Sequence, residues 1–372
     1  MNPINKDMSG KILVCSAGQG GHAISAYSTL RGNSVTLYSH TPKKVDLINA
    51  QGDTVFLSGL YSGVAQLESA TSDLESAVQS NDKIFIVSDA TAHRYYAEKM
   101  ALDLKNQDII LLSPGVGGAL EFYNLVKKLN PSSDITVSET DTLMYACKVP
   151  AIGHSHIKSE KNSLIYATVP SSKKNSVDDF ILKLYPQFIN TRNPLMGLDD
   201  SPVFHIVGMI KNAGRILNKE DFNFYIDGIT PEYAIFMEEM DAERCKVAEA
   251  VGIKPRTVNE WLNIAYGVEI SDLHTMIQNT PPYMNTEDTP NRSPAPKNLY
   301  HRYLMEEIPL RAVPTVEIAK IFNIETPKYE KMIREASELV GVDFMKSGRT
   351  LKDIGLSNNE ILNWKNNYSW DV

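Results

Sequence analysis

The chain of 372 residues contains only three cysteines, Cys15, Cys147 and Cys245, which lie far apart along the sequence. An odd number of cysteines without C-x-x-C spacing predicts free thiols in a reducing compartment rather than a disulfide framework. No apolar run of the sequence approaches the ~20 residues needed to cross a bilayer. The polar first ten residues also lack the apolar centre of a secretory signal. We therefore expect a cytoplasmic protein without a membrane partner.

The chain also has fewer positively than negatively charged residues. Lys and Arg number 37 against 45 Asp and Glu, which gives a formal net charge of −8. This balance argues against nucleic acid as a partner. We expect no metal site, because His154 and His156 share one side of a predicted strand but no third ligand is spaced near them. The length allows two domains, and the apolar content of 42% is typical of globular proteins.

The first half of the chain alternates short apolar runs with helical patterns. Five runs rich in β-branched residues end at turn residues and predict strands: 11–15, 34–39, 83–89, 108–114 and 134–139. Strands that alternate with helices predict a parallel sheet with helices on both faces. From about residue 193 onward, apolar residues recur at three-and-four spacing, which predicts a mainly helical second half.

A glycine-rich turn follows the first predicted strand, and we expect a helix after it. Such a turn binds the pyrophosphate of a dinucleotide when one glycine admits the phosphates and another lets the helix pack on the strand. Two registers fit the sequence: Gly18-x-Gly20-x-x-Ala23 and Ser16-x-Gly18-x-x-Gly21. Because the strand ends at residue 15, the turn begins at Ser16, and we choose the second register.

In this register Gly18 approaches the phosphates and Gly21 packs on the strand, while Gln19 and Gly20 complete the cofactor-binding loop ahead of a helix over 22–30. The turn and the alternating pattern together predict the fold class. We expect a Rossmann-type, doubly wound α/β domain with a parallel sheet for the dinucleotide, followed by a mainly α-helical domain for substrate and catalysis: residues 1–187 and 188–372.

The end of the second predicted strand indicates which dinucleotide binds. Ser39 lies 18 positions after Gly21, near the place where NAD-specific domains carry a carboxylate for the ribose. Here Ser39, His40 and Thr41 offer hydrogen-bond donors, and Lys43 adds positive charge. These side chains would attract a 2′-phosphate, so we expect NADP(H) in preference to NAD(H). A basic loop that does not touch the nucleotide is the alternative.

A histidine and an amide share one face of a predicted helix in the second half. His205 and Asn212 are seven positions apart, about two helical turns. Side chains of these types can donate a proton and bind a carbonyl group beside a nicotinamide. A lone helical histidine is nevertheless more often a core or surface residue.

Taken together, the chain resembles the opine dehydrogenases, the octopine/nopaline dehydrogenase family, over nearly its whole length. The resemblance rests on the order and spacing of the N-terminal turn and seven further segments: 89–93, 113–122, 138–150, 205–216, 225–252, 301–327 and 347–356. Members of this family reduce the imine of an amino acid and a 2-oxo acid with NAD(P)H, giving an N-(carboxyalkyl) amino acid. The resemblance therefore implies an NAD(P)-dependent oxidoreductase whose partners are an amino acid and a 2-oxo acid of the pyruvate or 2-oxoglutarate type.

The resemblance also implies roles for particular residues. The catalytic histidine of the family corresponds to His205, its asparagine to Asn212, and its carboxylate-binding arginine to Arg302. The family usually has an aspartate five residues after that arginine, which orients the histidine. Here Glu307 stands in its place, so the charge is kept and one methylene is added. A simple helical ion pair between Arg302 and Glu306 is the alternative for this stretch.

By the same resemblance, substrate and nicotinamide contacts are expected at Glu139, Thr140 and Thr142, although a capped connection explains this segment equally well. Three other functions stay open. They are an opine-metallophore synthase that uses a nicotianamine-like amine, a reductase of the ketopantoate or β-hydroxyacid type, and a catalytically silent NADP-binding sensor. We expect a monomer or a homodimer.

Overall fold

A computed structural model describes residues 4–113, 115–286 and 293–368 of the chain. Two units divide between Pro194 and Leu195, and each has its own hydrophobic core. The first unit extends beyond residue 187, because the short strand β12 (Phe188–Asn190) pairs with β11 (Leu164–Val169) of its sheet. In the described ranges, no helix is long and apolar enough to cross a membrane.

The first unit is built on an eight-stranded sheet with the order β12-β11-β8-β7-β6-β1-β2-β5. Neighbouring strands run parallel, except that β11 is antiparallel to β8. The five strands expected from the sequence form the centre of this sheet: β2 (Ser34–Tyr38), β1 (Lys11–Cys15), β6 (Lys83–Ile86), β7 (Asp108–Leu111) and β8 (Thr136–Thr140). The short strand β5 (Ser69–Thr71) lies at one edge. The predicted doubly wound α/β fold is confirmed.

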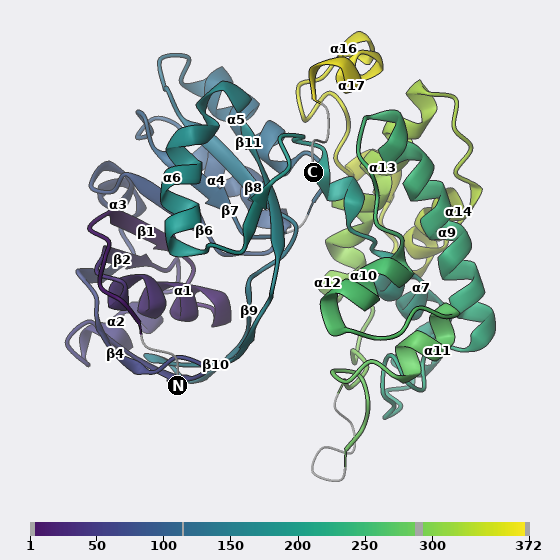
Figure 1. Cartoon of the computed structure of the whole chain (residues 1–372), viewed down its shortest axis with the longest axis horizontal. Helices are drawn as coiled ribbons and strands as arrows, with labels where there is room; N and C mark the ends of the chain where they lie inside the picture. Colours follow the sequence, from purple (N-terminus) through teal and green to yellow (C-terminus); the bar gives the residue numbers. More distant parts are fainter. Residues whose placement is uncertain (1–3, 114, 287–292, 369–372) are drawn as a thin grey trace. The chain divides into compact units, whose positions relative to one another are not determined.

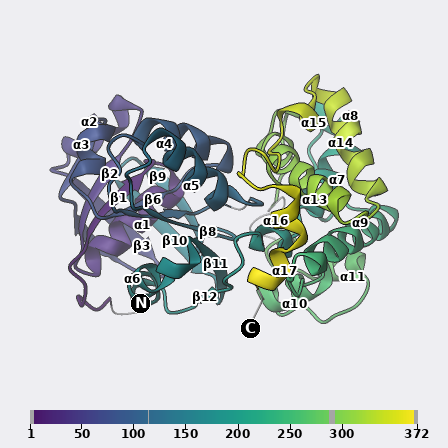
Figure 2. The same ribbon diagram turned by 90° about the horizontal axis from the view of Figure 1, so that it is seen from above.

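Helices cover both faces of this sheet, which explains the continuous apolar runs of the central strands. Ile12 and Val14 of β1 share a core with side chains of α1 (Gln19–Leu30) and α6 (Lys174–Leu184). Figure 2 shows these two helices on one side of the sheet, with α4 (His93–Met100) and α5 (Gly118–Leu129) on the opposite side. The remaining helices of the unit are α2 (Pro42–Asn49) and α3 (Leu74–Gln79), with short 3₁₀ turns at Ala90–Ala92 and Ser171–Lys173.

A second, four-stranded sheet packs on α1. Its order is β4-β3-β10-β9, with the bounds β4 (Gly63–Gln66), β3 (Thr54–Gly59), β10 (His154–Glu160) and β9 (Tyr145–Ala151). Helix α1 lies between the two sheets, so nearly all of its residues are buried. His154 and His156 both lie on β10, and no group of three potential metal-ligating side chains occurs among the described residues.

The second unit is helical, as predicted (Figure 1). Thr230 and Thr257 cap two of its helices, α9 (Pro231–Ala250) and α10 (Val258–Tyr266), by accepting backbone hydrogen bonds from the first turn. The helices are α7 (Val203–Lys211), α8 (Ala213–Leu217), α9 (Pro231–Ala250), α10 (Val258–Tyr266), α11 (Leu273–Gln278), α12 (Arg302–Met305), α13 (Val313–Ile321), α14 (Pro327–Val340), α15 (Phe344–Ser347), α16 (Asn358–Leu362) and α17 (Trp364–Asn367), with a 3₁₀ turn at Met196–Asp199 and a π-helical turn at Ile308–Ala312.

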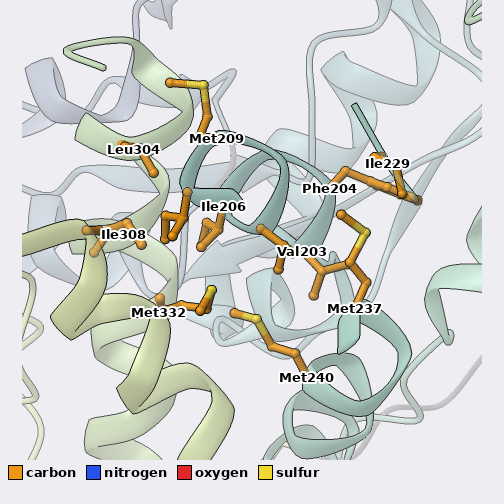
Figure 3. Packing of buried hydrophobic residues seen from close by; sticks show 14 of the residues in the cluster. Val203, Phe204, Ile206, Met209, Ile229, Met237, Met240, Leu304, Ile308 and Met332 are labelled. Atoms are coloured by element: carbon orange, nitrogen blue, oxygen red, sulfur yellow. The ribbon is translucent and has the colours of Figure 1, made fainter. Parts of the chain in front are cut away.

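Helix α7 runs through the middle of this unit. Figure 3 shows Val203 and Ile206 of α7 packed among buried side chains of α9, α12 and α14, including Met240, Leu304 and Met332. Because α7 is embedded in this way, its position is fixed by contacts on several sides. Any functional side chain on α7 is therefore held by the core of the unit.

Candidate active site

The glycine-rich turn leaves β1 at Ser16, whose φ of +107° lies in a region that residues other than glycine seldom adopt. The carbonyl oxygen of Ser16 lies only 1.7 Å from the place where a Cβ on Gly21 would stand. A Cβ on Gly20 would instead meet side-chain atoms of Val87 and Leu143, at 2.7 and 3.0 Å. Gly21 is therefore the glycine that packs against the backbone at the strand end, which is the packing that the register beginning at Ser16 predicts.

Helix α1 begins at Gln19, with Gly18 as its N-cap, three residues before the predicted start. The predicted start was wrong because glycine has a low intrinsic helix propensity, whereas close packing against the strand selects two glycines in this first turn. The first-turn amides of a helix have no acceptor within the helix and attract phosphate groups. None of the first-turn residues, all of which the structure describes, is acidic. The turn therefore suits the pyrophosphate of a dinucleotide.

His22 links this turn to the second sheet by hydrogen bonds. Its Nδ1 lies 2.9 Å from the carbonyl oxygen of Gly18, and its Nε2 lies 3.2 Å from the backbone nitrogen of Gly153, between β9 and β10. Because the Gly153 N–H is a donor, Nε2 accepts, and the neutral ring carries its proton on Nδ1. The ring is fully buried, and burial lowers the pKa of His22.

The residues predicted to select the cofactor surround the start of α2. Ser39 is buried, and its Oγ accepts a hydrogen bond of 3.2 Å from the backbone N–H of Thr41, the N-cap of α2. His40 and Lys43 are exposed. Lys44 donates from Nζ to the carbonyl oxygen of residue 17, in the glycine-rich turn, at 3.3 Å. Positive charge therefore stands next to the turn.

The three contact residues expected near the end of β8 have partners within the first unit. Oε2 of Glu139 accepts a hydrogen bond of 3.0 Å from the backbone N–H of Ala119, in the first turn of α5. Thr140 donates from Oγ1 to the carbonyl oxygen of Thr142 at 2.9 Å, and Lys161 donates to Oγ1 of Thr142. These residues lie at the carboxyl edge of the sheet, where doubly wound folds bind ligands. Their contact with a substrate stays a prediction.

His205 lies on α7, and its imidazole is held on three sides. Nδ1 lies 2.5 Å from Oε1 of Glu307, and Nε2 lies 3.0 Å from the hydroxyl oxygen of Tyr225. The ring of Tyr303 stacks on the imidazole with 3.7 Å between the centroids and 5° between the planes. The side chain of His205 is 27% exposed, whereas that of Glu307 is 6% exposed. A partly exposed imidazole backed by a buried carboxylate is suited to general acid–base catalysis.

A second ion pair lies near Glu307. It is formed by Arg311, four residues along the chain, and Asp200. Burial alone would lower the pKa of Arg311, but Asp200 and Glu307 hold it above its usual value. Because Asp200 pairs with Arg311, the negative charge of Glu307 stays beside Nδ1 of His205. Such a charge stabilises an imidazolium that forms during proton transfer.

Arg302, the predicted carboxylate-binding residue, begins α12. Its side chain is 48% exposed, and its Nε donates to Oε2 of the buried Glu306 at 2.9 Å. This is the helical ion pair that the sequence offers as the alternative. The pair occupies one of the five N–H groups of the guanidinium, so it is compatible with substrate binding.

Asn212 is placed differently from the expectation. Helix α7 ends at Lys211, so the continuous helix expected through Asn212 is interrupted at this residue. The amide nitrogen of Asn212 donates to the carbonyl oxygens of Gly208 and Gly228, at 2.9 and 2.8 Å. These hydrogen bonds stabilise the junction of α7 and α8. A role of Asn212 in catalysis stays a prediction.

Sequence patterns did not single out four residues of these sites: Tyr225, Tyr303, Arg311 and His22. Two signals were present: Tyr303 directly follows Arg302, and His22 directly follows the glycine pair. Tyr225 begins the segment 225–252 of the family resemblance, but its contact with His205 arises from the packing of segments that periodicity does not connect.

Reduction of a carbon–nitrogen double bond by a dinucleotide requires a hydride donor and a source of protons. The chain carries a structure suited to each, the glycine-rich turn in one unit and the histidine–carboxylate pair in the other. These features define the class of NAD(P)-dependent oxidoreductases.

Comparison with known proteins narrows this class to a family. Residues 198–340 match the family model described as NAD/NADP octopine/nopaline dehydrogenase, alpha-helical domain. Opine dehydrogenase of Arthrobacter sp. (strain 1C) is 30% identical over 347 residues, which are 92% of this chain and 94% of that protein. The chain therefore belongs to the opine dehydrogenase family, and it is an NAD(P)-dependent oxidoreductase acting on CH–NH bonds.

Solved structures share the fold of the whole chain. Octopine dehydrogenase with NADH and L-arginine superposes with a TM-score of 0.79 at 20% identity, covering 95% of this chain and 98% of that one. Yersinopine dehydrogenase bound to NADP⁺ superposes with a TM-score of 0.68 at 11% identity, covering 97% and 98%. Both likenesses show a shared fold, and the two relatives were solved with different nicotinamide dinucleotides.

Proposed function

We propose that this enzyme condenses the amino group of an amino acid with a 2-oxo acid of the pyruvate or 2-oxoglutarate type and reduces the product with NADPH to an N-(carboxyalkyl) amino acid. The pair of Nδ1 of His205 and Oε1 of Glu307, 2.5 Å apart, carries this proposal. A histidine with a buried carboxylate behind it can give a proton and stay charged without a large rearrangement. Family membership supports the same reaction class.

The residues divide the chemistry between them. Attack of the amine on the keto carbon gives a carbinolamine, whose oxygen must leave as water. His205 supplies the proton for this oxygen, and Glu307 stabilises the imidazolium. Arg302 binds the carboxylate of the 2-oxo acid through its guanidinium. The bound dinucleotide supplies the hydride.

The preference for NADPH rests on the start of α2. The segment that follows β2 carries Ser39, His40 and Thr41 where an NAD-specific domain carries a carboxylate. Lys43 is exposed in the first turn of α2, and none of the described residues of this turn is acidic. A phosphate placed here would meet positive charge and the favourable end of a helix dipole. A free 2′-hydroxyl would gain little from either.

A screen of NADPH and NADH oxidation tests this proposal. The enzyme is given pyruvate or 2-oxoglutarate, with and without a panel of neutral and basic amino acids and a nicotianamine-like amine. Turnover that requires both an amine and a 2-oxo acid supports the proposal, and turnover with the 2-oxo acid alone supports a reductase of the ketopantoate type. Tight binding of NADPH without any turnover supports a sensor. A higher kcat/KM with NADH than with NADPH refutes the cofactor preference.

The variant His205→Asn tests whether the activity depends on the proposed site. It removes the proton donor and keeps a polar side chain of smaller size. We expect kcat to fall by at least about 100-fold, while the Kd of NADPH stays unchanged because the dinucleotide turn belongs to the other unit. Near-normal turnover by this variant would exclude His205 as the acid.

A further inference from the structure

Tyr225 is the second hydrogen-bond partner of His205. Glu307 is an acceptor, so the proton of the neutral imidazole is on Nδ1, and Nε2 is the nitrogen that exchanges a proton with the substrate. The hydroxyl oxygen of Tyr225 lies 3.0 Å from this nitrogen. A substrate oxygen about 2.8 Å from Nε2 can lie at the same distance from the hydroxyl, because the three atoms then form a triangle of hydrogen-bond length. Two donors can thus converge on one oxygen.

The two donors are held in place by stacked rings. The phenol ring of Tyr225 stacks on Tyr283 with 3.9 Å between the centroids and 12° between the planes. Its backbone N–H donates to Oδ1 of Asn223 at 3.0 Å. The imidazole of His205 stacks on Tyr303 in the same manner. Donors fixed in this way stabilise developing charge without the cost of reorganisation.

The hydroxyl of Tyr225 also keeps its proton. Burial raises the pKa of Tyr225 well above its usual value of 10. A neutral phenol can donate a hydrogen bond over the whole pH range in which enzymes work. It can also accept a hydrogen bond from Nε2 when the imidazole is protonated.

We propose that Tyr225 is a second hydrogen-bond donor, beside His205, to the keto oxygen of the 2-oxo acid. This inference rests on the proposed function. When the carbinolamine breaks down, the C–O bond breaks and its electron pair stays on the oxygen, while the lone pair of the nitrogen forms the C=N bond. The imidazolium of His205 gives the proton that completes the leaving water. Tyr225 donates a hydrogen bond to the same oxygen and retains its own proton.

The variant Tyr225→Phe removes the hydroxyl and keeps the ring that stacks on Tyr283. We expect kcat to fall about 10- to 100-fold, as is usual for the loss of one donor to a developing charge, with an unchanged Kd for NADPH. The matched control is Tyr300→Phe in the same unit. It removes a hydroxyl that donates to the carbonyl oxygen of Val340 at 3.1 Å, and kcat should stay at the wild-type value. Thermal unfolding of each variant, followed by circular dichroism, reports whether the fold is kept.

Deuterium at C4 of NADPH separates this role from a merely structural one. If Tyr225 assists the departure of the oxygen, its loss makes that step limiting, and the deuterium effect on kcat falls toward one. A lower kcat with an unchanged or larger deuterium effect would mean that the variant misplaces the substrate for hydride transfer, and it overturns the proposal. Wild-type kcat in Tyr225→Phe overturns it as well. If the wild-type enzyme shows no amine-dependent turnover, the proposed function itself fails.

Discussion

Nδ1 of His205 lies 2.5 Å from Oε1 of Glu307, although the two residues are separated by 102 positions in the sequence. The carboxylate reaches the imidazole from the residue that directly precedes a π-helical turn, Ile308–Ala312. Such turns are rare and often occur at functional sites. Oε2 of Glu307 is buried and has no hydrogen-bond partner in the described parts of the chain. Oε1 of Glu307 therefore directs its hydrogen bond at the imidazole, and the longer glutamate fills the position where the family resemblance implies aspartate.

Glu307→Gln tests this pair. An amide cannot stabilise an imidazolium, and it can present an N–H to Nδ1 and so favour the wrong tautomer, so we expect kcat to fall roughly 10²- to 10⁴-fold. Glu307→Asp withdraws the carboxylate by about 1.5 Å, one carbon–carbon bond, and should keep the charge at a loss of about 10-fold. Steady-state kinetics measures kcat for each variant, and the Kd of NADPH is expected to stay unchanged. If Glu307→Asp were as active as the wild type, the distance between the carboxylate and the imidazole would not be critical.

Arg302→Lys separates substrate binding from the helical ion pair. Lysine keeps the charge but cannot bind a carboxylate in a bidentate manner, so the KM for the 2-oxo acid should rise about 10- to 100-fold. Lysine also keeps a positive charge beside the buried carboxylate of Glu306, so Tm should change little. Arg94, which pairs with the exposed Glu98 and the buried Glu121, gives the control: Arg94→Lys keeps the charge and should leave KM unchanged. A shift in Tm without a rise in KM would contradict the proposed role.

Local periodicity predicted the strands and helices whose apolar residues repeat regularly within a short stretch of the chain. The central strands of the large sheet are buried on both faces and form continuous apolar runs, and the long helix α14 carries a regular apolar face. The second sheet was missed because β3 and β10 are partly exposed, and their parallel pairing joins segments about a hundred residues apart. The contacts of His205 with Tyr225 and Tyr303 arise in the same way, from helix packing. Residue types could therefore suggest His205 as an acid, but they could not reveal its neighbours.

Alanine at two adjacent glycines tests the register of the dinucleotide turn. A Cβ at Gly21 would stand 1.7 Å from the carbonyl oxygen of Ser16, so the backbone must move. We expect Gly21→Ala to destabilise the first unit by more than about 3 kcal/mol, beyond ordinary overpacking, and to abolish NADPH binding. Gly20→Ala meets only side-chain ends and should weaken binding much less. Calorimetry with NADPH ranks the two variants, and the reverse order would support the other register.

His22 should make stability depend on pH. Burial holds its pKa in the folded protein below the usual 6.5, so the unfolded chain takes up a proton first as the pH falls. The contribution of His22 is therefore present above about pH 6.5 and is lost as the pH falls through the lowered pKa of the folded state. Unfolding by denaturant between pH 7.5 and 5 should show a shallower decline in His22→Gln, which cannot take up this proton. Parallel curves for the two proteins would rule out this contribution.

Ser39→Asp tests the choice of dinucleotide at a single residue. An aspartate can still accept the hydrogen bond that Oγ of Ser39 accepts from the backbone of Thr41, so the turn should keep its shape. Its negative charge would repel a 2′-phosphate and bind the ribose hydroxyls instead. We expect the KM for NADPH to rise about 10- to 100-fold while kcat/KM for NADH is kept or improved. Ser132→Asp adds the same charge at an exposed position ahead of β8, at the amino edge of the sheet, and should change neither value. An unchanged KM for NADPH in Ser39→Asp would mean that this segment does not contact the nucleotide.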